Sequence, residues 1–179
     1  LDDGSTLFMG PKDSMETQKK LGADIVMAFD ECVEYPATFD YVKNSLQKTT
    51  QWGKICREFE LDEHQFLFGI IQGGTFMDLR AQSAKEIVAL NFDGYAIGGV
   101  SVGEGLELLM KIVGHTAPLM PADRPRYLMG VGLPEDILAS VQRGMDMFDC
   151  IIPTKFARGG TFFTSFGKVR IIDERYRKD

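Results

Sequence analysis

The sequence predicts an α/β protein that forms part of a (β/α)8 TIM barrel, and two observations carry this prediction. Short apolar runs typical of strands alternate with longer patterns of helical periodicity, which implies parallel strands joined by helical crossovers. A polar residue or a glycine pair follows each run, as at the carboxyl ends of barrel strands, where functional groups gather. A complete barrel needs about 250 residues, so this chain is expected to hold about five of its eight units.

The expected strands are the apolar runs at residues 25–29, 66–71, 95–97, 127–129 and 147–148. Helical periodicity is expected over residues 37–60, 78–90, 104–114 and 134–144. In the last of these helices, Pro134 suits the first turn and Gly144 suits the stop. No linker interrupts the alternation, so residues 1–179 are expected to form a single domain, part of a barrel catalytic domain.

A doubly wound open sheet would give a similar alternation. In that fold polar residues gather around one switch point, whereas here a polar residue or a glycine stands at the end of every expected strand. These residues are Asp30, Gln72 before Gly73-Gly74, Gly98-Gly99, Met129-Gly130 and Asp149. The barrel is therefore the preferred fold.

The composition indicates a globular protein, because 44% of its 179 residues are hydrophobic. The sequence has no apolar run of about 18 residues for a membrane span and no pattern of a signal peptide, so a cytoplasmic protein without a membrane partner is expected. The first residue is Leu, and no capped helix is expected before the first strand, which suggests a fragment.

The cysteines and charges exclude some classes of function. Cys32, Cys56 and Cys150 lie far apart without ligand spacing, so no metal site is expected in this chain and the three thiols are expected to be buried and reduced. A net charge of −6 argues against a protein that coats nucleic acid with its whole surface. From residue 154 to 179, however, basic residues outnumber acidic ones, and such a segment can contact phosphates or form a solvated face.

Two carboxylates are candidates for chemistry. Asp149 follows a strand and opens onto a loop, which suits a nucleophile or base, and Asp30 has the same position after the first strand. Either one could instead cap a following loop or helix. If both face one cavity, they would suit glycosyl chemistry, in which one carboxylate attacks C1′ and another handles protons.

Three further strand ends offer binding groups. The amide of Gln72 presents a donor and an acceptor and could recognise a base or sugar edge, or stabilise a turn. The glycine-rich segment 96–105, which includes Gly99, lets a ligand approach the backbone, and phosphate binding is an equally good interpretation. Met129 would be ordinary core in most strands.

Five segments, FDECVEYPATFDY, FGIIQGGTFMDLRAQSA, FDGYAIGGVSVGE, PRYLMGVGLPEDI and MFDCIIPTKFARGGTFFTSFGK, together resemble the tRNA-guanine transglycosylase family in its bacterial form. The resemblance covers nearly the whole chain. It implies a β/α barrel and a glycosyltransferase of the pentosyltransferase type, which acts in queuosine biosynthesis. The reaction exchanges guanine at the wobble position of tRNA for a 7-deazaguanine, preQ1, through a covalent aspartyl-ribose intermediate.

By this resemblance, Asp149 matches the nucleophile that attacks C1′. Asp30 matches the residue that accepts hydrogen bonds from the guanine N1–H and amine, and Gln72 and the Gly99 amide match the donors to O6. Met129 matches the side chain that stacks against the flipped base.

Two segments match the RNA-contacting parts of the family. The first comprises Gly130, Val131, Gly132, Leu133, Pro134, Glu135 and Asp136. The second comprises Thr154, Lys155, Phe156, Ala157 and Arg158. The second departs from the family pattern, because Lys155 stands where Arg is usual and Lys cannot make the bidentate contact of Arg.

The resemblance also implies parts outside this chain. An aspartate that accepts a proton is expected upstream of Leu1, and a zinc site of three Cys and one His is expected beyond Asp179, so that zinc would be a cofactor of the full-length protein only. The expected partners are the tRNA anticodon loop, preQ1 and guanine, and a second copy in a homodimer.

Two rival hypotheses stay open. The first is a catalytically silent subunit of the same family that binds RNA or a catalytic partner. The second is a barrel enzyme acting on a sugar phosphate through the glycine-rich turn, which rests on fold analogy.

Overall fold

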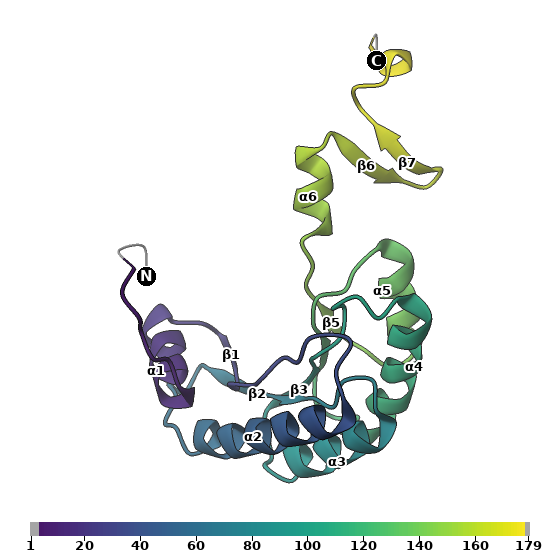
Figure 1. Ribbon diagram of the computed structural model, residues 1–179. Coiled ribbons are helices and arrows are strands. Elements are labelled where there is room, and N and C mark those ends of the chain that lie inside the picture. The colour runs from purple at the N-terminus through teal and green to yellow at the C-terminus, as the bar shows by residue number, and fades with distance from the viewer. Residues whose placement is uncertain (1–3, 178–179) are drawn as a thin grey trace.

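The computed structural model describes residues 4–177, which form a curved parallel sheet with helices on its outer side (Figure 1). The sheet has the strand order β1-β2-β3-β4-β5. Its strands are β1 (Ile25–Met27), β2 (Phe66–Ile71), β3 (Gly94–Ile97), β4 (Arg126–Leu128) and β5 (Met147–Phe148). All four neighbouring pairs are parallel. The α/β prediction and the partial barrel are confirmed, since the five strands form half of a barrel.

The order of the strands excludes the doubly wound alternative. Each strand pairs with the strand that follows it in sequence, so the order never reverses and the sheet has no switch point among the described residues. Successive crossovers in one direction curve the sheet toward a barrel. Consequently all five strands end at the same edge.

Helices follow the strands as the sequence predicts, with small shifts in their ends. The helices are α1 (Pro11–Leu21), α2 (Phe39–Arg57), α3 (Met77–Val88), α4 (Leu106–Thr116), α5 (Pro134–Val141) and α6 (Ile152–Arg158), with 3-10 turns η1 (Ala117–Leu119) and η2 (Glu174–Tyr176). Thr38 caps α2, its hydroxyl oxygen accepting from the Tyr41 N–H at 3.4 Å.

The core lies between the sheet and these helices. Ile71, Ile97 and Leu128 of the strands are fully buried, as are Ile87 of α3 and Ile112 of α4. Strands β2 and β3 are buried on both faces, which explains why their sequences are continuous apolar runs without alternation. The two strands that bear the central part of the site are therefore the most firmly packed.

Helix α1 corrects the expectation that no capped helix precedes the first strand. It begins at Pro11, which suits the first helical position, and the Asp13 carboxylate accepts from the Gly10 N–H at 2.9 Å. Gly22 ends the helix in the left-handed conformation. These signals were present in the sequence, but α1 has only one buried residue, Met15, so its apolar periodicity is weak.

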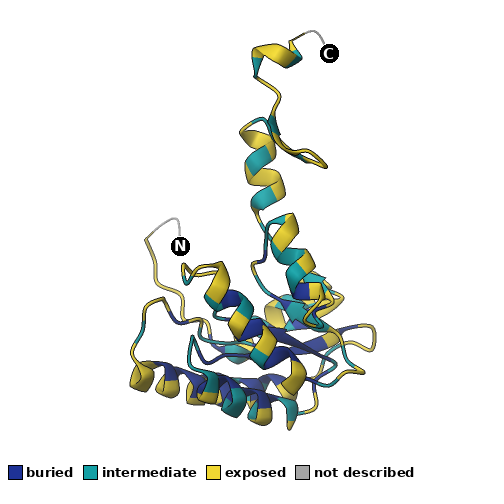
Figure 2. Cartoon of the chain, turned by 90° about the vertical axis from the view of Figure 1, so that its right-hand side faces the viewer, coloured by how far each residue is buried: buried dark blue, intermediate teal, exposed yellow. Residues whose placement is uncertain are grey.

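The carboxyl-terminal part of the described chain projects away from the sheet (Figure 1). It consists of α6 and an antiparallel hairpin of β6 (Thr161–Thr164) and β7 (Gly167–Arg170), followed by η2. No residue from 152 to 177 is buried, and Figure 2 shows this arm in the colours of exposed and intermediate residues. The sequence reading did not predict these elements.

The cysteine prediction is wrong for two of the three thiols. Cys56 is buried, but Cys32 is exposed and Cys150 has intermediate exposure. Both follow strand ends, where the chain opens toward solvent instead of continuing through the core. Among residues 4–177, no helix combines the length and apolar character that a membrane span requires.

Two glycines allow a matched test of the packing. A Cβ on Gly69 of β2 would clash with the Phe92 ring, whereas a Cβ on Gly53 of α2 would meet Ile87 and Leu90 at 3.5 Å, an ordinary contact. We expect Gly69→Ala to lower the free energy of unfolding by about 1–3 kcal/mol. Gly53→Ala should raise it by roughly 0.5–1 kcal/mol. Denaturant unfolding of the intact protein measures both, and equal effects would contradict the packing of β2.

Candidate active site

The predicted site residues gather at one edge of the sheet. Asp30 follows β1, Gln72 follows β2, Gly99 follows β3, Met129 follows β4 and Asp149 follows β5. Because the strands are parallel, these five positions lie along the carboxyl edge, where barrel proteins carry their functional groups. The edge divides into two parts, one around Gln72 and one around Asp149.

The first part pairs a carboxylate with a buried amide. The Gln72 Nε2 donates to the Asp30 Oδ2 at 2.5 Å, and Gln72 is only 3% exposed. Burial raises the pKa of Asp30 above its usual value, and the hydrogen bond from Gln72 partly opposes this shift. The pair therefore holds a partly desolvated carboxylate in a fixed position, which suits recognition of hydrogen-bond donors.

Gln72 lies against the backbone of the glycine pair. A Cβ on Gly99 would clash with the Gln72 side-chain oxygen, and a Cβ on Gly98 would lie 2.7 Å from its Nε2. Gly99 also has φ +62°, a conformation that favours glycine. The amide of Gln72 and the backbone of Gly99 are thus brought together, as the resemblance implies.

A buried arginine of α3 fixes this arrangement. The Arg80 guanidinium is fully buried and donates to the carbonyl oxygens of Ile71 at 3.0 Å, Gly98 at 2.7 Å, Gly99 at 3.0 Å and Gly74 at 2.8 Å. These carbonyls belong to the ends of β2 and β3 and to the loop after β2. One side chain therefore ties both strand ends to the helix.

A serine of the same helix completes the tether. The Gln72 N–H donates to the Ser83 Oγ at 3.0 Å, while the carbonyl of the same peptide group, that of Ile71, accepts from Arg80. Both ends of that peptide group are thus held by α3. The orientation of the Gln72 side chain follows from this rigid backbone.

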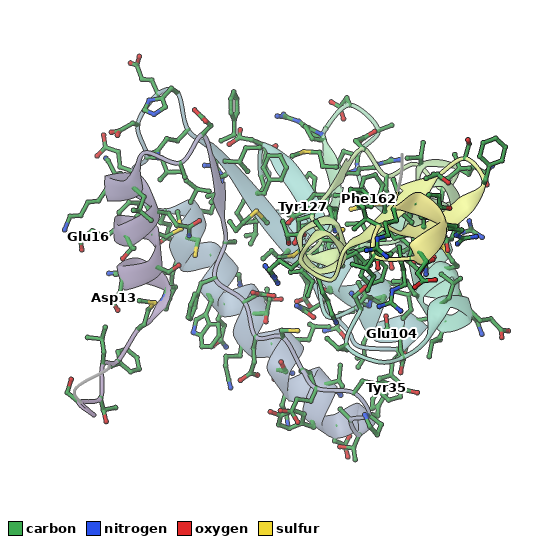
Figure 3. All side chains as sticks on the ribbon, turned by 90° about the horizontal axis from the view of Figure 1, so that it is seen from above. Asp13, Glu16, Tyr35, Glu104, Tyr127 and Phe162 are labelled. Carbon is green, nitrogen blue, oxygen red and sulfur yellow. The ribbon has the colours of Figure 1, made fainter. Side chains whose placement is uncertain are left out.

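The second part of the edge holds Asp149. Its Oδ1 accepts from the Tyr127 hydroxyl at 2.6 Å and from the Gly130 N–H at 2.8 Å. Within the described residues its Oδ2 makes no hydrogen bond, and the residue is exposed. Figure 3, seen from above, shows Tyr127 beside the base of the projecting arm. The carboxylate is thus oriented through one oxygen, and the other has no hydrogen-bond partner among the described residues.

The protonation state of Tyr127 suits its hydrogen bond to Asp149. Burial raises the pKa of its hydroxyl well above the usual value, and the hydrogen bond to Asp149 raises it further. The hydroxyl therefore stays protonated at neutral pH and remains a donor to the carboxylate.

The segment from Gly130 to Asp136 divides into buried and accessible residues. Val131 is 1% exposed and packs in the core, so its side chain does not face the surface. Pro134 and Glu135 are exposed at the start of α5, and the Asp136 Oδ2 accepts from the Leu133 N–H at 3.3 Å. A groove of about 300 Å³ runs between this segment and the loop of residues 101–106.

The segment from Thr154 to Arg158 lies in α6, on the projecting arm. Phe156 stacks on Phe163 of β6 with ring centroids 5.3 Å apart, and the Lys168 ammonium lies 5.4 Å from the Phe156 centroid. Lys155 and Arg158 are exposed on the same helix. The arm thus combines aromatic rings with cationic side chains, and the sequence reading singled out neither Phe163 nor Lys168.

The loop after β3 is held in place by the Glu104 carboxylate. The Glu104 carboxylate accepts from the N–H groups of Ser101 at 2.6 Å and Val102 at 2.9 Å. Val102 lines a hollow of about 300 Å³ with Tyr35 and Cys32, and Figure 3 shows Glu104 and Tyr35 at the same end of the molecule. Val102 also lines a neighbouring hollow together with Gly99, so its side chain limits the space beside Gly99.

Tyr127 and Arg80 are the main residues of the site that were not predicted from the sequence, although each has a feature in the sequence that could have indicated it. Arg80 occupies a position on the apolar stripe of α3, with Ser83, Ala84 and Ile87 at the following helical positions. A charge on a buried stripe indicates a partner in the core. Tyr127 lies two residues before Met129 in the strand expected at residues 127–129, and strand alternation assigns both to the same face.

The described residues offer no place for a metal ion. Between residues 4 and 177, no three His, Cys, Asp or Glu side chains lie together in an arrangement that could hold one.

Fold and site together define a barrel-type α/β protein whose sheet edge bears the exposed carboxylate of Asp149 and the hydrogen-bonded pair of Asp30 and Gln72. A family model described as queuine tRNA-ribosyltransferase matches residues 2–179. The chain belongs to this family.

Relatives with the same description cover nearly the whole chain. It is 53% identical over 178 residues to the queuine tRNA-ribosyltransferase of Ruminiclostridium cellulolyticum, which is 99% of this chain and 48% of that protein. The corresponding protein of Halothermothrix orenii is 51% identical over 177 residues, 99% of this chain and 48% of its own length. That of Staphylococcus aureus strain Mu50 is 53% identical over 178 residues, 99% of this chain and 47% of its own length. The chain therefore spans about half the length of the curated relatives it matches.

The buried carboxylate leads to a stability prediction. Because burial raises the pKa of Asp30, its ionised form destabilises the folded state, and we expect Asp30→Asn to raise the Tm of the intact protein at neutral pH. Asn retains an oxygen that accepts from Gln72. The difference should shrink as the pH falls through the raised pKa and vanish below the ordinary value of 3.8.

Asp123→Asn, at an exposed position, controls for the loss of one negative charge. Thermal unfolding across pH measures both variants. A lower Tm for Asp30→Asn at neutral pH would show that the carboxylate stabilises the fold and would contradict the assigned cost of its burial.

Proposed function

We propose that the protein containing this chain is a tRNA-guanine transglycosylase that exchanges guanine at the wobble position of tRNA for preQ1, in queuosine biosynthesis. The proposal rests on the hydrogen bonding of the Asp149 carboxylate. One carboxylate oxygen is held by Tyr127 and Gly130, and the other is unengaged within the described chain, at the edge that also bears Asp30, Gln72 and Gly99. Family membership supports the same activity.

The base-binding part accounts for selection of guanine. The Asp30 carboxylate accepts hydrogen bonds from N1–H and the exocyclic amine, which adenine does not present on that edge. Gln72 and the Gly99 N–H donate to O6. Met129, which is half-buried after β4, provides the surface for the flipped base.

Asp149 carries the covalent steps. Its free carboxylate oxygen forms a bond to C1′ of the ribose as the bond from C1′ to N9 breaks, and the electron pair leaves with guanine. The incoming base then attacks C1′ and releases Asp149, so that two displacements retain the configuration. The proton on N9 of the incoming base passes to a group outside this chain, by resemblance an aspartate upstream.

The projecting arm supplies the RNA contacts. Its exposed Lys155 and Arg158 provide charge for phosphates, and the aromatic pair of Phe156 and Phe163 provides a surface on which bases can stack. The acidic body does not attract RNA, so binding concentrates at the strand ends and the arm. The exposed residues at the start of α5 border the same region.

The nucleophile is tested by trapping the adduct. We expect Asp149→Asn to abolish the covalent complex between the intact protein and tRNA, because an amide does not attack C1′. Asp146→Asn is the matched control. It lies directly before β5, at the other end of the strand from Asp149, and its carboxylate accepts only from the Arg126 N–H in the described structure. Denaturing gel electrophoresis measures the adduct.

Each outcome of this experiment separates the hypotheses. Loss of the adduct in Asp149→Asn but not in Asp146→Asn supports the proposal. Noncovalent binding of tRNA by the unmutated protein without any adduct would indicate the silent subunit, and the absence of any interaction with tRNA would favour a barrel enzyme of another class.

The choice of the incoming base is tested at Val102. Its side chain fills space in the hollow with Cys32 and Tyr35, so a short aminomethyl substituent should fit, whereas the bulky cyclopentenediol of queuine should clash. We expect Val102→Gly to raise queuine use roughly tenfold or more relative to preQ1. Competition of the two bases for one tRNA measures the ratio, and equal use by the unmutated protein would contradict the pocket argument.

A further inference from the structure

Arg80 carries a buried positive charge without a carboxylate partner. No ion pair of Arg80 exists within the described residues, and its nitrogen atoms donate to four backbone carbonyls instead. Burial lowers its pKa to about 10, opposed in part by Glu104, so the guanidinium remains charged at neutral pH. A charge in such surroundings polarises the groups that solvate it.

The shortest of these hydrogen bonds reaches one particular peptide group. The Arg80 Nη1 lies 2.7 Å from the Gly98 carbonyl oxygen, and that carbonyl shares its peptide group with the Gly99 N–H. In a trans peptide the carbonyl and the N–H point in opposite directions. The guanidinium therefore lies on one side of this group, and the Gly99 N–H is directed to the other.

Gly99 is also one of the residues that line a hollow together with Tyr35 and Val102. The Gly99 N–H interacts with the thiol of Cys32, an exposed residue, and this contact opposes the increase in the pKa of the thiol that desolvation causes. Sulfur is a weak acceptor, so a carbonyl oxygen of a ligand would replace it readily. A strengthened donor at this point would act directly on such a ligand.

We propose that Arg80 is a positioning residue that acts through the peptide group of Gly98 and Gly99 and makes the Gly99 N–H a stronger donor to the 6-oxo group of the base. This inference rests on the proposed function. When the bond from C1′ to N9 breaks, the electron pair remains on the leaving base and part of the negative charge reaches O6. A polarised donor fixed at that oxygen stabilises the charge without reorganisation.

The binding experiment uses two bases that differ at one atom. Guanine and 6-thioguanine share N1–H and the exocyclic amine, but the thiocarbonyl sulfur accepts hydrogen bonds poorly. Equilibrium binding of each base to the intact protein is measured for wild type, Arg80→Met, Arg80→Lys and Ile87→Ala. Ile87 is a buried residue of α3 that makes no side-chain hydrogen bond, so it controls for loss of packing.

We expect Arg80→Met to weaken guanine binding about tenfold and 6-thioguanine binding less than threefold, because only the contact to oxygen loses charge assistance. Arg80→Lys, which keeps the charge, should recover part of the guanine affinity. Ile87→Ala should change both affinities by the same factor. In the exchange reaction, Arg80→Met should lower kcat while leaving the KM for tRNA nearly unchanged.

If Arg80→Met weakens the binding of both bases equally, or of neither, the inference is overturned. Arg80 would then have a structural role only. If circular dichroism shows that Arg80→Met does not fold, Arg80→Gln, which also removes the charge but keeps a hydrogen-bond donor, takes its place in the same comparison. Failure of the unmutated protein to bind guanine or to form an adduct would instead overturn the proposed function, so the two failures are distinguishable.

Discussion

The ends of β2 and β3 are held by one buried guanidinium, and the candidate site depends on this contact. Arg80 binds the carbonyls of Ile71, Gly98 and Gly99, which places the Gln72 amide and the Gly99 backbone against each other. Gln72 then holds Asp30 from the neighbouring strand. A chain of hydrogen bonds thus extends from α3 through two strand ends to a third. A buried cation requires full satisfaction of its donors, so the loops that carry them have little freedom.

The curved sheet separates the two tasks of the proposed reaction. The groups proposed to recognise the base lie after β1, β2 and β3, where burial raises the pKa of Asp30 and the Gln72 side chain is almost fully buried. The proposed nucleophile, Asp149, lies after β5, where it is exposed and accepts a hydrogen bond from Tyr127. The cationic arm extends from the same edge (Figure 1). A partly buried set of hydrogen-bonding groups and an exposed carboxylate on one edge suit a substrate whose base is enclosed while its ribose and phosphates remain at the surface.

The sequence was sufficient to predict the sheet and the positions of the strand ends. Buried parallel strands are continuous apolar runs, and Asp30, Gln72 and Asp149 mark where three of these runs end. The sequence was insufficient for contacts that cross between elements. The hydrogen bond between Tyr127 and Asp149 spans two strands, and no local pattern specifies it. The sequence shows Arg80 as a charged residue on an apolar helix stripe. Its acceptors are backbone carbonyls, which every residue has, so the sequence does not specify which carbonyls it binds. The arm was missed because its helix and hairpin bury no residue and therefore have no apolar periodicity.

The most direct test of this account is a crystal structure of the intact protein with guanine bound. The account predicts that the O6 of guanine lies within hydrogen-bond distance of the Gly99 N–H and the Gln72 amide, that N1–H and the exocyclic amine face Asp30, and that N9 points toward Asp149. A base bound in the reverse orientation, or bound away from the ends of β1, β2 and β3, would contradict it.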